Sequence, residues 1–164
     1  ELEIANYLNK VSEGRLSSES KLEIRGMLRE VTEIESIGDS CYNLARTINR
    51  KRSGGNDFTE KQYEHIHQMM QLTDDALAQM IAVVEDEHHA VDVNKSFNIE
   101  NEMNNYRAQL KNQNVVDVNN KEYDYQMGVH YMDLIGECEK LGDYVVNVVE
   151  ARTNVKEKKV GDNR

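Results

Sequence analysis

Three oxygen-bearing residues follow one another at intervals of four, and the same set occurs twice in the sequence. The first set is Glu35, Asp39 and Asn43, and the second is Glu139, Asp143 and Asn147. Because residues i and i+4 share one face of a helix, each set forms a stripe. Like charges at this spacing destabilise a helix by roughly 0.2–0.5 kcal/mol, which a bound cation would offset. Oxygen donors on one rigid face therefore predict two sites for a metal cation.

Further carboxylates could complete these sites from a second helix. The additional candidates are Glu3, Glu33, Glu102 and Glu137. All-oxygen ligation suits a divalent or trivalent ion, with iron, zinc, magnesium and calcium all open. Acidic stripes on helices are also common as solvated surface, so a surface role remains the alternative for every one of these residues.

Other polar residues predict less. His65 and His67 are two apart and point to different sides of a helix, whereas Glu85 and His89 are four apart and could grip a metal at a helix junction. The sequence contains neither HExxH nor CxxC, and no phosphate-binding loop follows its only Gly-Gly pair. Cys41 and Cys138 are expected on apolar faces as small buried residues. No catalytic residue is predicted.

The two stripes lie within an internal repeat. Residues 33–45 (EIESIGDSCYNLA) and 137–149 (ECEKLGDYVVNVV) are identical at five positions. A weaker echo precedes it, since Glu1, Glu3, Asn6 and Tyr7 recur at an offset of 99. We interpret the chain as two copies of one three-helix unit, the first without its opening helix. The predicted division is residues 1–53 for the partial first unit and 54–164 for the second.

Composition favours an all-α bundle. The 164 residues include no proline, which long helices exclude and turn-rich folds use freely. Apolar residues recur every three or four positions, and this period predicts five helices. They are expected at about 2–11, 18–50, 57–84, 88–110 and 123–155. The third should open on Asp57 with Glu60 as its capping box, and a polar connection is expected over 112–120.

Charge and hydropathy exclude some partners. A formal charge of −10 repels nucleic acid and anionic headgroups, so no nucleic-acid partner is expected. The apolar runs are far shorter than the roughly 20 residues that span a bilayer. Two cysteines cannot build a disulfide framework, which favours a cytosolic setting.

The strings EIESIGD and ECEKLGD, each followed four residues later by asparagine, resemble the E-x-x-x-D motif of the PhoU family of phosphate-uptake regulators. Members of that family consist of two repeated three-helix bundles. The family's arginine after the glutamate is replaced here by Ser36 and Lys140. The beginning in mid-repeat is more similar to the PhoU-like domain that follows the membrane part of bacterial sodium/phosphate cotransporters than to a free-standing PhoU protein.

This resemblance implies a regulatory, metal-binding domain at the cytoplasmic face of the inner membrane. The implied metal ligands are Glu35, Asp39, Glu139 and Asp143, with Glu3, Asn43, Glu102 and Asn147 as weaker candidates. The implied partner is the membrane transporter domain of the same chain. Two alternatives stay open: a structural helical adaptor without metal, and a ferritin-like di-iron enzyme, although no Glu-x-x-His pair accompanies either stripe.

A two-fold homodimer is also expected. If the first unit lacks a helix, the apolar face of its long helix lacks a cover, and a patch of that size is rare on a monomer. The residues concerned are Leu28, Val31, Ile34, Ile37, Leu44 and Ile48. Packing of this face onto the second unit within one chain is the alternative.

Overall fold

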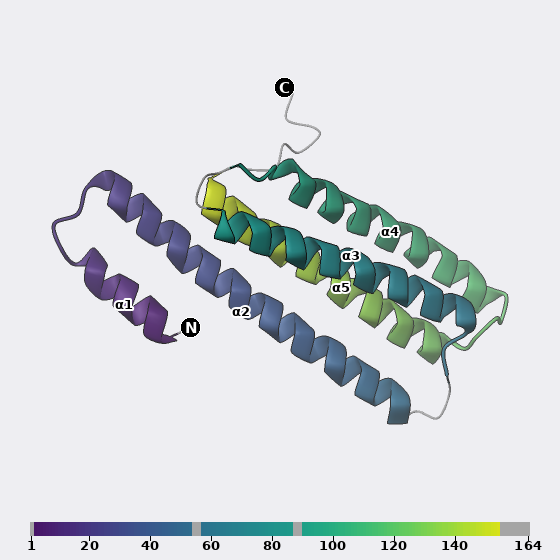
Figure 1. The fold of residues 1–164 in the computed structure, drawn as a ribbon. Coiled ribbons are helices and arrows are strands. Elements are labelled where there is room, and N and C mark those ends of the chain that lie inside the picture. Colours follow the sequence, from purple (N-terminus) through teal and green to yellow (C-terminus); the bar gives the residue numbers. More distant parts are fainter. Residues whose placement is uncertain (1, 54–56, 87–89, 155–164) are drawn as a thin grey trace, which may run out of the picture.

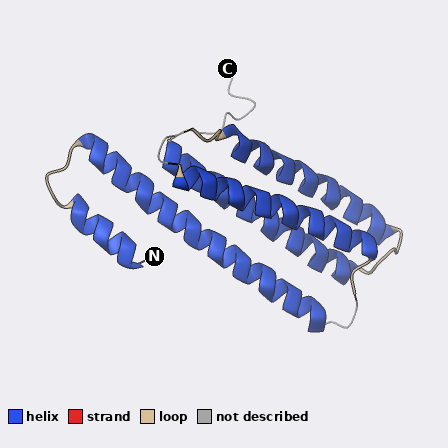
Figure 2. Ribbon diagram, in the orientation of Figure 1, coloured by secondary structure: helices blue, strands red, loops and turns tan. Residues whose placement is uncertain are grey.

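The computed structural model describes residues 2–53, 57–86 and 90–154, and over these residues helices are the only regular elements (Figure 1, Figure 2). The five helices are α1 (Leu2–Ser12), α2 (Ser18–Ser53), α3 (Glu60–Glu85), α4 (Asn94–Asn119) and α5 (Tyr125–Thr153). The predicted all-α class and the number of helices are confirmed. With no proline to interrupt it, α2 runs unbroken for 36 residues.

Helix α5 is the centre of the molecule. It packs against α2, α3 and α4, whereas α1 contacts α2 alone among the described helices. Helices α3, α4 and α5 form a three-helix bundle, and α2 lies along its side, antiparallel to α5 (Figure 1). The three helices of this bundle come from residues assigned to the second predicted unit, and α1 and α2 come from the first.

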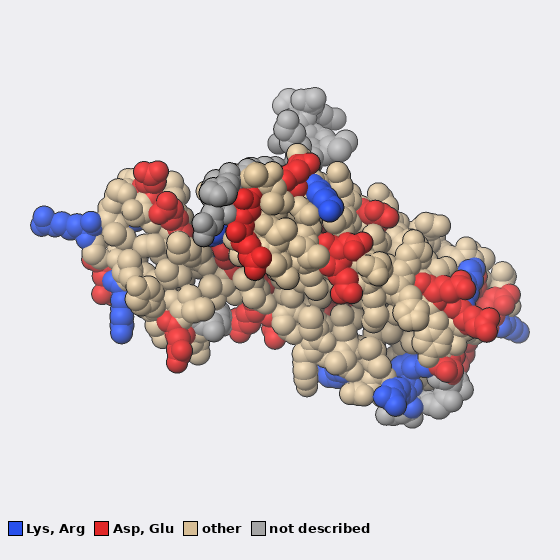
Figure 3. All heavy atoms as spheres, viewed as in Figure 1, with Lys and Arg blue, Asp and Glu red and all other residues tan. Residues whose placement is uncertain are grey.

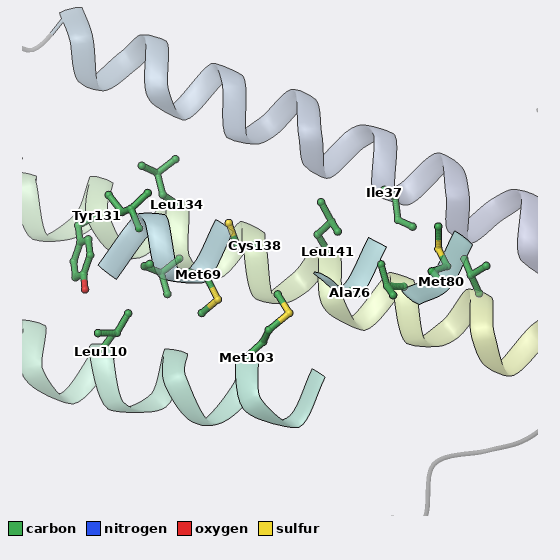
Figure 4. Packing of buried hydrophobic residues seen from close by; sticks show 14 of the residues in the cluster. Ile37, Met69, Ala76, Met80, Met103, Leu110, Tyr131, Leu134, Cys138 and Leu141 are labelled. Atoms are coloured by element: carbon green, nitrogen blue, oxygen red, sulfur yellow. The ribbon is translucent and has the colours of Figure 1, made fainter. Parts of the chain in front are cut away.

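The core is built around the apolar face of α5. Leu134, Leu141 and Val148 are almost completely buried, and they belong to one core cluster with Met69 of α3, Met103 of α4 and Ile37 of α2. Leu134 and Leu141 are directed towards α2 (Figure 4). The spacing of these α5 residues by seven places them on one side of the helix. The opposite side of α5 is left for polar residues, as the stripe pattern predicts.

Helix α4 differs most from its predicted range. It begins at Asn94 rather than near His88 and continues to Asn119, so the expected polar connection over 112–120 is almost entirely helical. Its last turns are held by polar contacts: Gln113 donates to Asp117 one turn on, and Tyr123 donates to Asn114 at 3.0 Å. Such contacts replace the apolar stripe that sequence periodicity relies on.

The start of α3 is also different from the prediction. Thr59 is the N-cap and forms a capping box with Gln62, so the expected box of Asp57 and Glu60 is wrong. Asp57 instead receives a hydrogen bond from the Tyr63 hydroxyl at 2.6 Å and pairs with Lys51 of α2. The Asp57 side chain that the local sequence pattern assigned to the N-cap is therefore paired with Lys51 of another helix.

Helix α2 packs back onto the second unit within one chain. Ile37 is buried in the core cluster and Leu44 packs against it, so α5 covers much of the face that was expected to lie open. Ile34 and Ile48 remain exposed. Cys41 is exposed, which corrects the prediction that it is buried, whereas Cys138 is buried as expected. The predicted boundary at 53/54 falls where α2 ends.

Acidic side chains are spread over the visible face of the bundle, and most of the Lys and Arg visible there lie towards its two ends (Figure 3). In the described part of the chain, none of the helices combines the length and the apolar character that a membrane crossing requires.

Candidate functional site

The second stripe lies on the polar side of α5. Glu139 and Asn147 are half-buried and Asp143 is exposed. Leu141, Val145 and Val148, which follow the stripe residues by one or two positions, are at most 1% exposed. The prediction that this helix has one apolar and one oxygen-rich face is confirmed.

Glu139 is paired with a cation of α4. The Nε atom of Arg107 lies 3.5 Å from the Glu139 Oε2 atom, and both side chains are partly shielded from water. Burial raises the pKa of Glu139, the negative charge of Asp143 raises it further, and Arg107 acts in the opposite direction. The carboxylates of Glu139 and Asp143 are therefore close enough to interact electrostatically, as binding of one shared cation would require.

Gly142, beside Asp143, permits the close approach of α4. A Cβ atom at this position would lie 3.0 Å from the sulfur of Met103. Because Arg107 and Met103 both contact α5, the face of α4 that meets the stripe is the one that carries residues 100, 103, 104 and 107. On this face Glu100 is buried and accepts a hydrogen bond from Asn104.

Glu100 is thus the carboxylate of α4 that the sequence interpretation passed over. The weak repeat echo aligns it with Glu1, and that signal could have singled it out. The candidate actually chosen, Glu102, is exposed on α4. Glu102 points away from the core, whereas Glu100 is buried on the face of α4 that is directed towards α5.

Asn147 belongs to a polar network that joins α5 to α2. Its amide donates to Glu33 Oε2 at 3.1 Å, and its carbonyl oxygen accepts from Arg29 at 3.2 Å. Arg29 also contacts Glu150 at 3.1 Å and Glu33 at 4.0 Å. Sequence reasoning missed Arg29, although its spacing of four from Glu33 is typical of a helical ion pair.

The first stripe is in a different environment. Glu35 and Asp39 are exposed on α2, Asn43 is half-buried, and a Cβ atom at Gly38 would meet open space in the described structure. Glu3 lies nine residues before the end of α1 and Glu35 seventeen after the start of α2. At 1.5 Å per residue their levels along the hairpin differ by about 12 Å, so Glu3 is not brought beside this stripe.

The remaining candidates are not assembled into a site. Glu137 is 3.9 Å from Lys140 of its own helix, and its Oε2 atom is buried without a hydrogen bond. His89, the proposed partner of Glu85, lies outside the described residues. His65 is not a free surface residue, because its Nδ1 lies 2.8 Å from the Tyr131 hydroxyl. Across residues 2–53, 57–86 and 90–154, no three His, Cys, Asp or Glu side chains are grouped as a metal site.

A cavity of about 530 Å³ lies where the end of α2 meets the start of α3. The Lys51 ammonium on its wall contacts Asp57, the Tyr63 hydroxyl at 3.1 Å and the Phe58 ring at 4.6 Å from its centroid. The Lys51 and Tyr63 hydrogen bonds lower the pKa of Asp57 to about 2. We call these contacts of Lys51 with Asp57, Phe58 and Tyr63 the clasp, and they connect the end of α2 to the start of α3. No repeat or motif in the sequence predicted them.

A family model described as PhoU domain matches residues 66–151, which is just over half of the chain. The match covers most of α3, all of α4 and nearly all of α5. It therefore includes Glu139 and Asp143 of the second stripe. No curated protein and no solved structure matches the chain.

Proposed function

This chain belongs to the PhoU family, and we propose on that basis that it is a regulatory, metal-binding domain of a sodium-dependent inorganic phosphate transporter. The family match indicates a phosphate-related regulatory role. PhoU domains are regulatory or adaptor domains rather than enzymes, which disfavours the di-iron alternative. The proposed location is the cytoplasmic face of the inner membrane, and the proposed partner is a membrane transporter domain of the same chain.

The observation that carries the metal proposal is the repeated carboxylate pair, one on α2 and one on α5. Glu139 and Asp143 supply oxygen donors that hard cations prefer, and burial together with the negative charge of Asp143 raises the pKa of Glu139. The donor set fits a cation in its chemistry but supplies only two carboxylates per helix. Glu100 lies on the face of α4 that is directed towards α5, but it is not grouped with Glu139 and Asp143 in the part of the chain that the structure describes.

A bound cation would supply the positive charge that Arg107 now gives to Glu139. Arg107 would compete with a cation for the Glu139 carboxylate, so a bound cation would weaken the contact of Arg107 with α5. Because Arg107 belongs to α4, its release loosens one contact between α4 and α5. This is how occupation of the stripe would reach the packing of the bundle and, through it, the transporter.

One observation favours the adaptor alternative. Arg107 already neutralises Glu139, and Asn147 already uses its amide and its carbonyl oxygen in the network with Arg29 and Glu33. An adaptor needs these contacts to hold its helices together and needs no metal. The two proposed functions differ in one property: the stripe carboxylates of a metal-binding domain bind an added metal ion, and those of an adaptor do not.

Calorimetric titration with Mg²⁺, Ca²⁺, Zn²⁺ and Fe³⁺ tests the metal proposal. We expect the double variant Glu139→Ala/Asp143→Ala to lose binding at the second stripe and to keep its helical circular dichroism spectrum, because both side chains lie away from the core. The matched control is Glu60→Ala/Glu64→Ala, which removes an exposed pair with the same spacing from α3. Equal affinity in both variants and the wild type would leave the adaptor as the function.

The transport context needs a separate experiment. The coding sequence upstream of Glu1 should contain a region of about a dozen membrane segments, an expectation that comes from the resemblance. Sodium-dependent phosphate uptake should then change when Glu139→Ala/Asp143→Ala is introduced into the complete gene product. A coding sequence without that hydrophobic region would reject the transporter context.

A further inference from the structure

Another cavity lies at the end of the bundle where α3 begins, α4 ends and α5 begins (Figure 1). Its volume is about 350 Å³, which is within the range of pockets that hold small molecules. Gln62 of α3, Asp117 of α4 and Tyr131 of α5 are among the residues that line it. Tyr131 precedes Glu139 by eight residues, or about 12 Å along the helix, so this cavity is separate from the second stripe.

The lining of this cavity, which we call the polar cavity, differs from the core beside it. Among the described residues, every side chain that lines it can donate or accept a hydrogen bond. The cavity at the end of α2, by contrast, is lined in part by Ile48, Phe58 and Leu134. Because an apolar ligand would leave polar groups without partners, the polar cavity suits a molecule that makes many hydrogen bonds.

Gln62 keeps an unused hydrogen-bond donor in the polar cavity. Only 2% of this residue is exposed, and its Oε1 atom accepts the backbone N–H of Thr59 at 3.0 Å. Its Nε2 atom is buried and has no hydrogen-bond partner within the described ranges. Burial and the charge of Asp117 raise the pKa of Tyr123 to about 12, and the Gln62 side chain acts in the opposite direction, so the Gln62 amide is directed towards this cavity-lining hydroxyl. An acceptor atom of a ligand would recover the free energy that an unpaired buried donor costs.

The charges inside the polar cavity balance one another. Lys61 Nζ lies 4.0 Å from Asp117 Oδ2. Burial lowers the pKa of His65, so the neutral form of its ring dominates at pH 7. Glu122 also lines the cavity, but it is exposed to water, and dissolved salt screens its charge. The cavity therefore favours a ligand without net charge.

We propose that the polar cavity binds a small neutral molecule with several hydroxyl groups, of the size of a monosaccharide or a cyclic polyol. Each hydroxyl group both donates and accepts, so such a ligand satisfies donors and acceptors of one lining. One ligand oxygen accepts from Gln62 Nε2, and one ligand hydroxyl donates to Asp117. The Asp117 carboxylate has room for this bond, because a carboxylate offers about four acceptor sites and Gln113 uses one of them at 2.6 Å.

Proton NMR of the histidine rings in the full 164-residue chain tests the proposal. The probes are myo-inositol, D-glucose and D-ribose, each titrated through millimolar concentrations. We expect at least one of them to shift the ring signals of His65 in a saturable way, because His65 lines the polar cavity. His67 lies on the same helix outside this cavity, and its signals should stay unchanged. The variant His65→Gln identifies the His65 signals by their loss.

Three results of this titration would overturn the proposal. If no probe gives a saturable shift of His65, water alone fills the polar cavity. If His67 shifts while His65 does not, the probe binds in the cavity at the end of α2, which His67 lines. If inorganic phosphate, added as a fourth probe, shifts His65 saturably and the three polyols do not, the cavity selects an anion.

The variant Gln62→Glu removes the unused donor and keeps the shape of the side chain. Glutamate retains the acceptor for the Thr59 N–H and is a usual residue at this position of a capping box. We expect the affinity for the binding probe to fall about tenfold, as for the loss of one hydrogen bond, with an unchanged circular dichroism spectrum.

Gln68→Glu is the matched control for this variant. Its Oε1 atom also accepts a hydrogen bond, from the Tyr106 hydroxyl at 2.8 Å, and the residue lies outside the polar cavity. The control should bind the probe as the wild type does. Equal affinity of Gln62→Glu and Gln68→Glu would overturn the proposed role of the Gln62 donor. The titration of the wild type decides the proposal by itself if Gln62→Glu does not fold.

Discussion

Replacement of Leu141 by alanine gives a direct measure of how α5 divides into two faces. Leu141 is 1% exposed and lies two residues from Glu139 and from Asp143, so it should be a core residue beside a polar stripe. The substitution removes three buried carbon atoms, worth about 2.4 kcal/mol at about 0.8 kcal/mol each. The surrounding helices cannot close the cavity completely, which brings the expected loss of unfolding free energy to about 3–5 kcal/mol.

Urea denaturation followed by circular dichroism measures this loss at one fixed protein concentration. For a chain of this length the melting temperature should fall by roughly 6–20 °C, at about 2–4 °C per kcal/mol. Leu22→Ala is the matched control, because Leu22 is 65% exposed on α2 and should lose less than about 0.5 kcal/mol. A loss below about 1 kcal/mol for Leu141→Ala would mean that the two faces are assigned the wrong way round.

Two further predictions concern the repeat glycines and the clasp. Gly142→Ala should destabilise the protein by about 1 kcal/mol or more, since the new Cβ atom meets Met103. Gly38→Ala should stabilise the protein by up to about 1 kcal/mol, because alanine has the higher helix propensity and the space around Gly38 is open. Equal effects of the two substitutions on thermal unfolding would contradict this contrast. The pKa of Asp57 is lowered from 3.8 to about 2, so its pairing with Lys51 stabilises the fold above about pH 4 and is lost as the pH falls towards 2. The stability difference between wild type and Asp57→Asn should therefore shrink over that interval, and a difference independent of pH would refute the pairing.

The sequence predicts those helices best whose apolar residues repeat strongly. The long run of α2 and the seam of α5 were placed to within a few residues, because burial on one side imposes the period. Periodicity did not predict the last turns of α4, because these turns hold partly buried polar groups rather than an apolar stripe. Asp117 accepts a hydrogen bond from Gln113 and lies 4.0 Å from Lys61 of α3. Such contacts depend on other helices and leave no periodic signal.

The stripes were predictable and their surroundings were not. Spacing by four fixes that Glu139, Asp143 and Asn147 share a face of α5, since this is a property of one helix. The partner of Glu139 is Arg107 of α4 and a partner of Asn147 is Arg29 of α2, and both arginines are distant from the stripe in the sequence. For the same reason Cys41 was misplaced: periodicity put it on an apolar face, but the packing of α2 on α5 leaves that face open.

The contact of Glu33 with Asn147 joins the two copies of the duplicated motif. By the repeat, Glu137 corresponds to Glu33, and Asn43 corresponds to Asn147. The antiparallel helices place Glu137 opposite Asn43, so the α2–α5 contact has the form of a two-fold interface between identical subunits, now enclosed within one chain. Glu137 lies beside Lys140 instead, with one oxygen left without a hydrogen bond. The two ends of this pseudo-symmetric contact therefore differ within one chain, where a substitution in one copy of the motif leaves the other copy unchanged.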